Sequence, residues 1–246
     1  EAMEAAQAND PFADADEIVL AAGTYTLVRG SLNGVHQPLR VQGAGPTQTR
    51  VVTADEDASL FVAASDGELA LAGVGLDSGG SAIIANEDSS LSLDDIIVEE
   101  GSTYFGSGAT VEMRNSELRG SLFCYGEALI EDSSIFNLYQ MEPQEGVPAV
   151  TLRRTTVDGT LYPDALLPSS MTVHAGSLTI DDSMVADSTL RIMGPASIDV
   201  RDSTITRSSV NFEDAAATLA LRRVHYLGNS GPGRTEVAAS VTIEGS

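Results

Sequence analysis

A repeat of about 22 residues is the feature that most constrains the fold of this chain. Segments such as Leu91–Asp95 and Ile198–Ser203 begin with two apolar residues that are separated by one other residue, and charged or small residues follow them. The first apolar position, called the anchor, recurs eleven times, at Ile18, Leu39, Leu69, Leu91, Val111, Ala128, Val150, Leu178, Ile198, Leu219 and Val241. A period in the twenties that is built from short strands predicts a solenoid, in which each coil buries its apolar face against the next.

Two further apolar columns follow the anchors. The position two residues on is apolar from the third coil onward, and the position seven residues on holds Leu76, Val98, Leu118, Ile135, Val157, Val185, Ile205 and Tyr226. A spacing of two residues predicts a strand with one face inward. The diagnostic pattern of leucine-rich repeats is absent. We therefore predict an all-β, single-stranded right-handed parallel β-helix of about 10–11 coils over residues 17–246, within one domain of residues 1–246.

Two polar columns support this register. Four residues after the anchors lie residues that tolerate a left-handed backbone, namely Gly73, Asp95, Asn115, Asp132, Arg154, Asp182, Asp202, Arg223 and Gly245. Three residues after the anchors the charge mostly alternates in sign, through Asp94, Arg114, Glu131, Arg153, Asp181, Arg201, Arg222 and Glu244. The first column predicts a tight turn and the second a surface ladder of ion pairs. Both roles are structural rather than catalytic.

The charge and the cysteine content exclude several classes of function. The chain carries 13 Arg, no Lys and 36 acidic residues, a net charge of -23 that disfavours nucleic acid as a partner. Arg residues interrupt the acidic ladder, which argues against mimicry of nucleic acid, whereas a halophilic origin stays open. The single cysteine, Cys124, can form no internal disulfide, and its apolar surroundings predict a core thiol. No apolar run is long enough for membrane insertion.

The first 27 residues resemble the entry of pectin-lyase-like β-helices. Residues Glu1–Asn9 form an Ala-rich run, and Asp16–Leu27 give an Asp-x-Ile-x-Leu-x-x-Gly-x-Tyr strand and turn. This pairing is most similar to the CSLREA domain of surface proteins. The resemblance implies a capping helix over residues 1–10 that covers the end of the solenoid, and an extracellular or cell-surface location. It carries no catalytic site.

Enzymatic residues of the related lyases and hydrolases are not recognisable in the sequence. Such lyases need calcium-binding Asp residues with an Arg or Lys base, and the hydrolases need clustered Asp residues with a Gly-His-Gly segment. The three histidines, His36, His174 and His225, lie in different coils without metal spacing. We therefore predict no enzymatic activity, no cofactor and no metal site. The alternative is a polysaccharide lyase or glycoside hydrolase acting on acidic polysaccharide.

A stripe of aromatic residues is the predicted binding site. A third strand column, Leu122, Leu138, Leu161, Leu190 and Val210, is expected to face inward, so the residue after each should face outward. With Phe105 or Tyr104 one coil earlier, this places rings in adjacent coils. We predict that Phe105, Phe123, Tyr125, Tyr139 and Tyr162 bind a partner, flanked by insertions at residues 136–147 and 158–170. The alternative is that these rings pack under neighbouring loops.

The combined interpretation is a non-catalytic, secreted or cell-surface scaffold for adhesion or recognition. The expected partner is a glycan or a surface protein, and the sequence does not choose between them. Segment Val241–Ser246 begins a coil that does not finish within the sequence. Unpaired strand edges there predict self-association or contact with a further domain.

Overall fold

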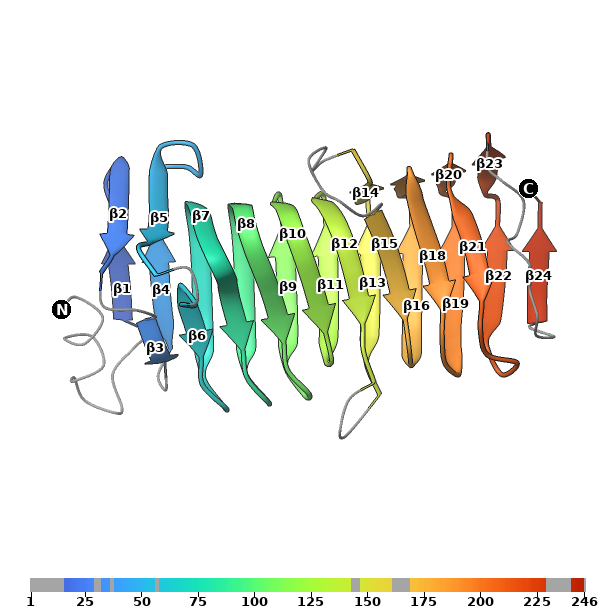
Figure 1. Cartoon of the computed structure of the whole chain (residues 1–246), viewed down its shortest axis with the longest axis horizontal. Helices are drawn as coiled ribbons and strands as arrows, with labels where there is room; N and C mark the ends of the chain where they lie inside the picture. Colours follow the sequence, from blue (N-terminus) through green and yellow to red (C-terminus); the bar gives the residue numbers. More distant parts are fainter. Residues whose placement is uncertain are drawn as a thin grey trace.

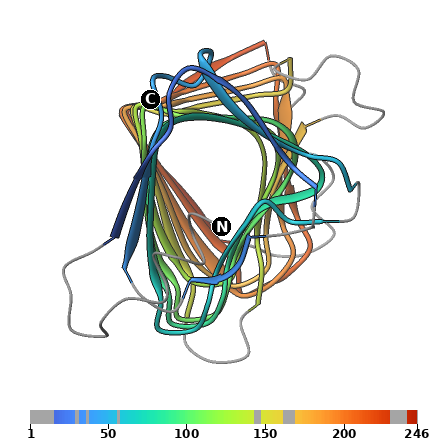
Figure 2. The same cartoon turned by 90° about the vertical axis from the view of Figure 1, so that its left-hand side faces the viewer.

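The computed structural model describes residues 16–28, 32–35, 38–55, 58–142, 147–160, 169–228 and 240–245. Its 24 strands belong to one continuous sheet in which all pairings are parallel, wound into a rod (Figure 1). Viewed along the rod, the coils superimpose around a common interior (Figure 2). The predicted all-β parallel β-helix is therefore confirmed, and no helix occurs in the described ranges. The predicted capping helix at residues 1–10 lies outside them.

Three ladders of stacked strands form the walls of the rod. The first ladder contains β1 (Asp16–Val19), β4 (Leu39–Gln42), β7 (Glu68–Ala85), β8 (Ser90–Phe105), β9 (Thr110–Arg114), β11 (Glu127–Glu131), β13 (Ala149–Arg153), β16 (Gly176–Asp181), β19 (Ala196–Arg201), β22 (Thr218–Arg222) and β24 (Ser240–Glu244). These eleven strand segments, spaced by about 4.8 Å, give a rod roughly 50 Å long.

The second and third ladders complete each coil. The second contains β2 (Gly23–Leu27), β5 (Thr49–Thr53), β10 (Glu117–Cys124), β12 (Ser134–Gln140), β14 (Thr156–Asp158), β17 (Met184–Ala186), β20 (Thr204–Thr206) and β23 (His225–Leu227). The third contains β3 (Leu32–Val35), β6 (Phe61–Ala63), β15 (Ser169–Val173), β18 (Ser188–Ile192) and β21 (Ser209–Phe212). The long strands β7 and β8 run through all three ladders, and β10 and β12 run through the second and third.

The predicted register is correct from the second anchor onward. Leu39 pairs with Leu69, and each later anchor pairs with the next, as far as Leu219 with Val241. The first interval is wrong by two residues, because Leu39 pairs with Asp16 and Ile18 pairs with Val41. A shift of two keeps the same face of the strand inward, so Ile18 still packs against the core. The inward column is otherwise almost fully buried, with Leu69 and Leu178 at 0% exposure.

The turn from the first ladder to the second uses one residue with a left-handed backbone. All nine residues predicted for this column have a positive φ, from 46° to 53° in the seven that are not glycine. Asp and Asn tolerate this conformation better than most residues because their short side chains bond locally. The predicted turn column is therefore confirmed, and the nine coils from the third onward bend at an equivalent point.

A ladder of buried hydroxyl groups follows this turn, five residues after the anchors. Its members are Ser116, Ser133, Thr155, Ser183 and Ser203, all at 9% exposure or less. The Thr155 N–H donates to the Ser183 Oγ at 3.0 Å, and the Ser183 N–H donates to the Ser203 Oγ at 3.1 Å. The four serine hydroxyls of this ladder thus each accept, from the preceding coil, a backbone donor that the tight turn would otherwise leave unsatisfied.

The predicted ion-pair ladder forms in the middle of the rod. Glu131 lies between Arg114 and Arg153, with nitrogen-to-oxygen distances of 3.2 Å and 3.0 Å. One coil further, Arg153 approaches Asp181 at 3.8 Å. These pairs are largely solvent-exposed on the Arg side, so each contributes about 0.2–1 kcal/mol at most.

Other arginines of the two polar columns do not form the ion pairs predicted between adjacent coils of the ladder. Arg201 forms its ion pair with Asp199 on its own strand, and this hydrogen bond holds the pKa of the Asp199 carboxyl below its usual value. In the turn column, Arg154 instead makes two bonds of 2.7 Å to Asp132. The ladder is therefore split between the two polar columns.

The exposed turn residue Asp182 gives a direct test of the backbone constraint. Its φ is 46°, so Asp182→Val should cost about 1–2 kcal/mol because a β-branched residue is strained in this region. Asp182→Gly should cost no more than a few tenths of a kcal/mol, because glycine adopts a positive φ freely. Urea unfolding of the three proteins measures the difference. Equal stabilities of the Val and Gly variants would contradict the assignment.

The core thiol predicts a dependence of stability on pH. Cys124 is fully buried, as predicted, and burial raises the pKa of its thiol to about 12. In the unfolded chain the thiol titrates near about 8.5, so the folded state holds this proton more tightly above that pH. The contribution of Cys124 to the free energy of unfolding should be constant below about pH 8 and decline as the pH rises toward 12.

A comparison with Cys124→Ala isolates this effect. The variant is less stable at neutral pH because it leaves a cavity, but the stability difference between the two proteins should shrink above about pH 8.5. Denaturation curves at a series of pH values measure it, and slow alkylation of the native thiol is the accompanying control. A difference that stays constant up to pH 10 would refute the titration.

Candidate functional site

Three aromatic rings stack along the outer face of the third ladder. Tyr104 pairs in register with Phe123, and Phe123 pairs with Tyr139. The Tyr104 and Phe123 ring centroids are 4.7 Å apart at an interplanar angle of 6°, and those of Phe123 and Tyr139 are 5.0 Å apart at 14°. We call these three side chains the ring ladder. The predicted outward aromatic stripe therefore exists at Phe123 and Tyr139, each of which is partly exposed.

One predicted member of the stripe is misplaced, and another lies outside the described residues. Phe105 is at 0% exposure and pairs with the inward-facing Cys124, so the expectation that its ring faces outward is wrong. Tyr104 takes the outward position, because successive residues of a strand point to opposite faces. Next to Tyr139, the position predicted for Tyr162 is held by Thr172 of β15. Tyr162 itself lies outside the described residues.

The insertions also begin later than predicted. Residues 136–140 of the first predicted insertion belong to β12, and the connection to β13 starts at Met141. In the second, Asp158 ends β14 and Ser169 begins β15, so the extra residues precede the third-ladder strand instead of following it. Counting from the anchor ignores an insertion between two ladders, so the third-ladder position of this coil is held by β15 residues such as Thr172.

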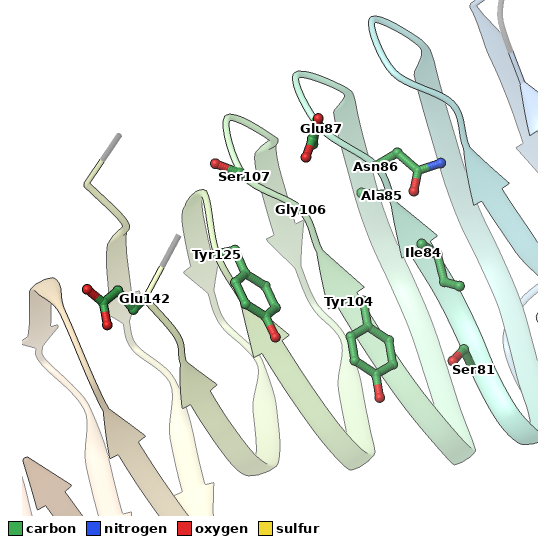
Figure 3. A pocket seen from close by; sticks show the side chains of 10 residues that line it. All are labelled: Ser81, Ile84, Ala85, Asn86, Glu87, Tyr104, Gly106, Ser107, Tyr125 and Glu142. Atoms are coloured by element: carbon green, nitrogen blue, oxygen red, sulfur yellow. The ribbon is translucent and has the colours of Figure 1, made fainter. Parts of the chain in front are cut away.

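A surface pocket of about 600 Å³ adjoins the ring ladder. It is lined by Tyr104 from β8, by turn residues of four successive coils, and by Ile84 from β7. Figure 3 shows that Tyr104 and Tyr125 extend from neighbouring coils on the same side of the sheet, with Glu87 and Ser107 on the turns beside them and Glu142 one coil beyond Tyr125. We call this the tyrosine pocket. Tyr125, one of the residues predicted to bind a partner, lines this pocket, although it belongs to a turn and not to the ring ladder.

The stacking limits which ring surfaces a ligand can reach. Phe123 is covered on both faces, by Tyr104 and by Tyr139. The free face of Tyr104 lies toward Ile84, its register partner in the preceding coil and another residue of the pocket wall. Tyr139 also accepts a hydrogen bond from Ser170 at 3.2 Å. Tyr104 and Tyr125 are therefore the rings best placed to contact a ligand.

The chemistry of the tyrosine pocket combines apolar surface with oxygen atoms. Two exposed carboxylates, Glu87 and Glu142, line it together with the Ser107 hydroxyl and the Asn86 amide. None of these four residues was identified from the sequence. They lie on turns between the third and first ladders, whose lengths vary from coil to coil, so no column of the repeat marks them. A site with these groups can stack on apolar rings and hydrogen-bond to hydroxyl groups.

The described residues contain no group of three or more His, Cys, Asp or Glu side chains that could hold a metal ion. Within the same residues, no helix is long and apolar enough to cross a membrane.

Comparison with known proteins finds similarity in structure but not in sequence. No family model matches the chain, and no curated protein sequence matches it. Its structure is similar to the A-module of the mannuronan C-5 epimerase AlgE6 of Azotobacter vinelandii, with 10% identity and a TM-score of 0.47, over 99% of this chain and 93% of that one. It is also similar to the catalytic domain of a GH87 α-1,3-glucanase in complex with nigerose, with 10% identity and a TM-score of 0.49, over 93% of this chain and 63% of that one.

The similar solved structures are a module of a carbohydrate epimerase and the catalytic domain of a glucanase. The prediction that this chain is not an enzyme is corrected beside them and is not kept. That prediction was based on missing lyase and hydrolase motifs. The absence of those motifs does not by itself exclude catalysis. At these identities the likeness itself shows the fold alone.

The contribution of the ring ladder to stability can be measured at its centre. Phe123→Leu keeps an apolar side chain but removes both stacked contacts, and each is worth about 0.5–1.5 kcal/mol beyond simple burial. We therefore expect Phe123→Leu to lower the free energy of unfolding by about 1–3 kcal/mol, measured by urea denaturation. Leu122→Ile, at the buried neighbouring position, controls for general disturbance of the strand. A Phe123→Leu variant as stable as the parent would show that the stack is incidental.

Proposed function

We propose that this chain is a carbohydrate-active protein that binds a polysaccharide at the tyrosine pocket. The observation that carries the proposal is the convergence of Tyr104 and Tyr125 with Glu87 on one pocket across successive coils. Binding sites usually combine apolar and aromatic walls with a few placed polar groups, which describes this pocket.

Sugar rings match this combination of groups. A pyranose ring has faces made of C–H groups, which pack against aromatic side chains, and an edge of hydroxyl groups, which need hydrogen-bond partners. Tyrosine supplies an aromatic face and a hydroxyl in one side chain, and Glu87 supplies acceptor oxygens. A flat protein interface would not need a pocket of about 600 Å³, so a glycan fits better than the surface protein that the sequence also allowed.

Tyr125 is the residue on which binding should depend most clearly, because it lies outside the ring ladder. We expect Tyr125→Ala to weaken glycan binding about fivefold to tenfold, since an aromatic contact is worth about 1 kcal/mol. Adding Tyr104→Phe, which keeps the stack but removes a hydroxyl, should weaken it further. Calorimetry with neutral and acidic polysaccharides measures both changes.

Tyr226→Ala is the matched control, because Tyr226 is a partly exposed tyrosine on β23, away from the pocket. It should leave binding unchanged. If Tyr125→Ala and Tyr226→Ala bind every tested glycan as the parent does, the tyrosine pocket is not the site.

A second function, cleavage of the bound polysaccharide, is proposed for the same pocket, which is lined by carboxyl side chains. Most glycoside hydrolases use two carboxyl side chains beside the scissile bond, one as acid and one as base or nucleophile. Glu87 and Glu142 line the tyrosine pocket from turns three coils apart, about 14 Å at about 4.8 Å per coil. They are too far apart to act on one bond as a pair, so each is a candidate acid or base by itself. Incubation with a panel of acidic and neutral polysaccharides, followed by assay of reducing ends, tests for the activity. Any product release should fall at least about a hundredfold in Glu87→Gln or Glu142→Gln, while binding persists.

The proposal also covers the location of the protein and its relationship to a family. We propose an extracellular or cell-surface location and a relationship to pectin-lyase-like proteins of the CSLREA type. The support is the segment Asp16–Leu27, whose predicted strand and turn fold as β1 and β2. Self-association through the exposed edge at β24 likewise stays a prediction, and nucleic acid stays disfavoured by the net charge of -23.

A further inference from the structure

We infer that the binding path continues from the tyrosine pocket along the axis of the rod and that its occupant is an uncharged polysaccharide chain. This inference rests on the proposed function and adds the class of the ligand and its direction. It is carried by a second surface pocket, of about 620 Å³, which shares Glu142 with the tyrosine pocket.

The second pocket is built from the same row of turns, further along the rod. Its wall contains Pro148 before β13, Gly176 at the start of β16, Ala196 at the start of β19 and Thr218 at the start of β22. We call it the small-residue pocket. Gly176 has a φ of 81°, and a Cβ there would lie 2.0 Å from the Pro148 carbonyl oxygen, so the backbone itself excludes larger residues at this point. The depression is therefore fixed by the packing of adjacent coils.

A buried amide lies behind the wall of the small-residue pocket. Gln140 is at 0% exposure, and its Nε2 donates to the carbonyl oxygens of Pro148, Ala175 and Ser177, at 3.2, 2.8 and 3.1 Å. All three residues line the pocket. The Gln140 Oε1 has no hydrogen-bond partner among the described residues. The three donated hydrogen bonds hold the backbone of this wall in place.

The two pockets together match an extended ligand. Their walls come from the seven successive turns that precede β8, β9, β11, β13, β16, β19 and β22. Adjacent coils are about 4.8 Å apart, so six intervals give a path about 30 Å long that runs parallel to the rod axis. A ligand of this length must be a linear chain of several units, and not a single sugar.

Charge selects among such chains. The charged residues that line the two pockets are Glu87 and Glu142, both acidic, and the chain as a whole carries a net charge of -23. A polyuronate would bring one further negative charge with each sugar and would be repelled. An uncharged glucan avoids this penalty. The acidic polysaccharide considered from the sequence is therefore disfavoured as the ligand.

A length series of uncharged glucan oligosaccharides, from disaccharide to octasaccharide, tests the path by calorimetry. We expect the affinity to rise at least about tenfold from the shortest to the longest member, and a polyuronate series of equal lengths to bind more weakly. Ser197→Arg places a long side chain in the small-residue pocket from an exposed position on β19. It should remove the gain with length and leave disaccharide binding unchanged.

Ser92→Arg is the matched control, because Ser92 is an exposed residue of β8 outside both pockets, and it should keep the full gain with length. A flat length series, or an unchanged series in Ser197→Arg, overturns the path while Tyr125→Ala still reports on the proposed function. Tighter binding of the polyuronates overturns the choice of ligand. If no glycan of any length binds, or an extended peptide binds in its place, both the inference and the proposed function fail.

Discussion

From the third coil onward, one residue with a left-handed backbone turns the chain from the first ladder into the second, and the rest of the rod depends on this turn. Because the bend falls at the same place in these coils, residues such as Asn115 and Asp132 stack, and so do the hydroxyl groups that follow them. A shift of one residue would exchange the inward and outward faces of the next strand. The turn therefore fixes which side chains reach the core and which, like Tyr104, reach the surface.

The number of residues between this turn and a given position also decides whether the orientation of that position could be predicted from the sequence. Columns within seven residues of the anchor, such as Leu118 with Ile135, stack as expected, because no insertion separates them from the turn. The third ladder was predicted less well, since chain length varies before it is reached. Phe105 was expected outward and is buried, and Thr172 occupies the place expected for Tyr162. The fold could be predicted from local periodicity, whereas the members of the candidate site depend on how many residues each turn contains.

The candidate site divides the aromatic residues into two roles. Phe123 is enclosed by its neighbours, so it contributes to the packing of three coils and offers a ligand only its edge. Tyr125 lies on a turn and contributes to the pocket wall without stacking in the ring ladder. An aromatic stripe in a β-helix sequence can thus indicate packing and binding at once. The carboxylates Glu87 and Glu142 carry no periodic signal and became visible only when the turns were placed in space.

The ring ladder gives the protein an optical property that follows from its composition. The chain has six tyrosines and no tryptophan, so tyrosine dominates its near-ultraviolet absorption and its intrinsic fluorescence. Tyr104, Tyr125 and Tyr139 are half of these chromophores, and two of them lie in a stack with centroid spacings of 4.7 and 5.0 Å. Aromatic transitions couple at such spacings, and the asymmetric surroundings make them optically active. Light absorbed by the native rod therefore samples the neighbourhood of the pocket directly, and the protein carries its own spectroscopic label there.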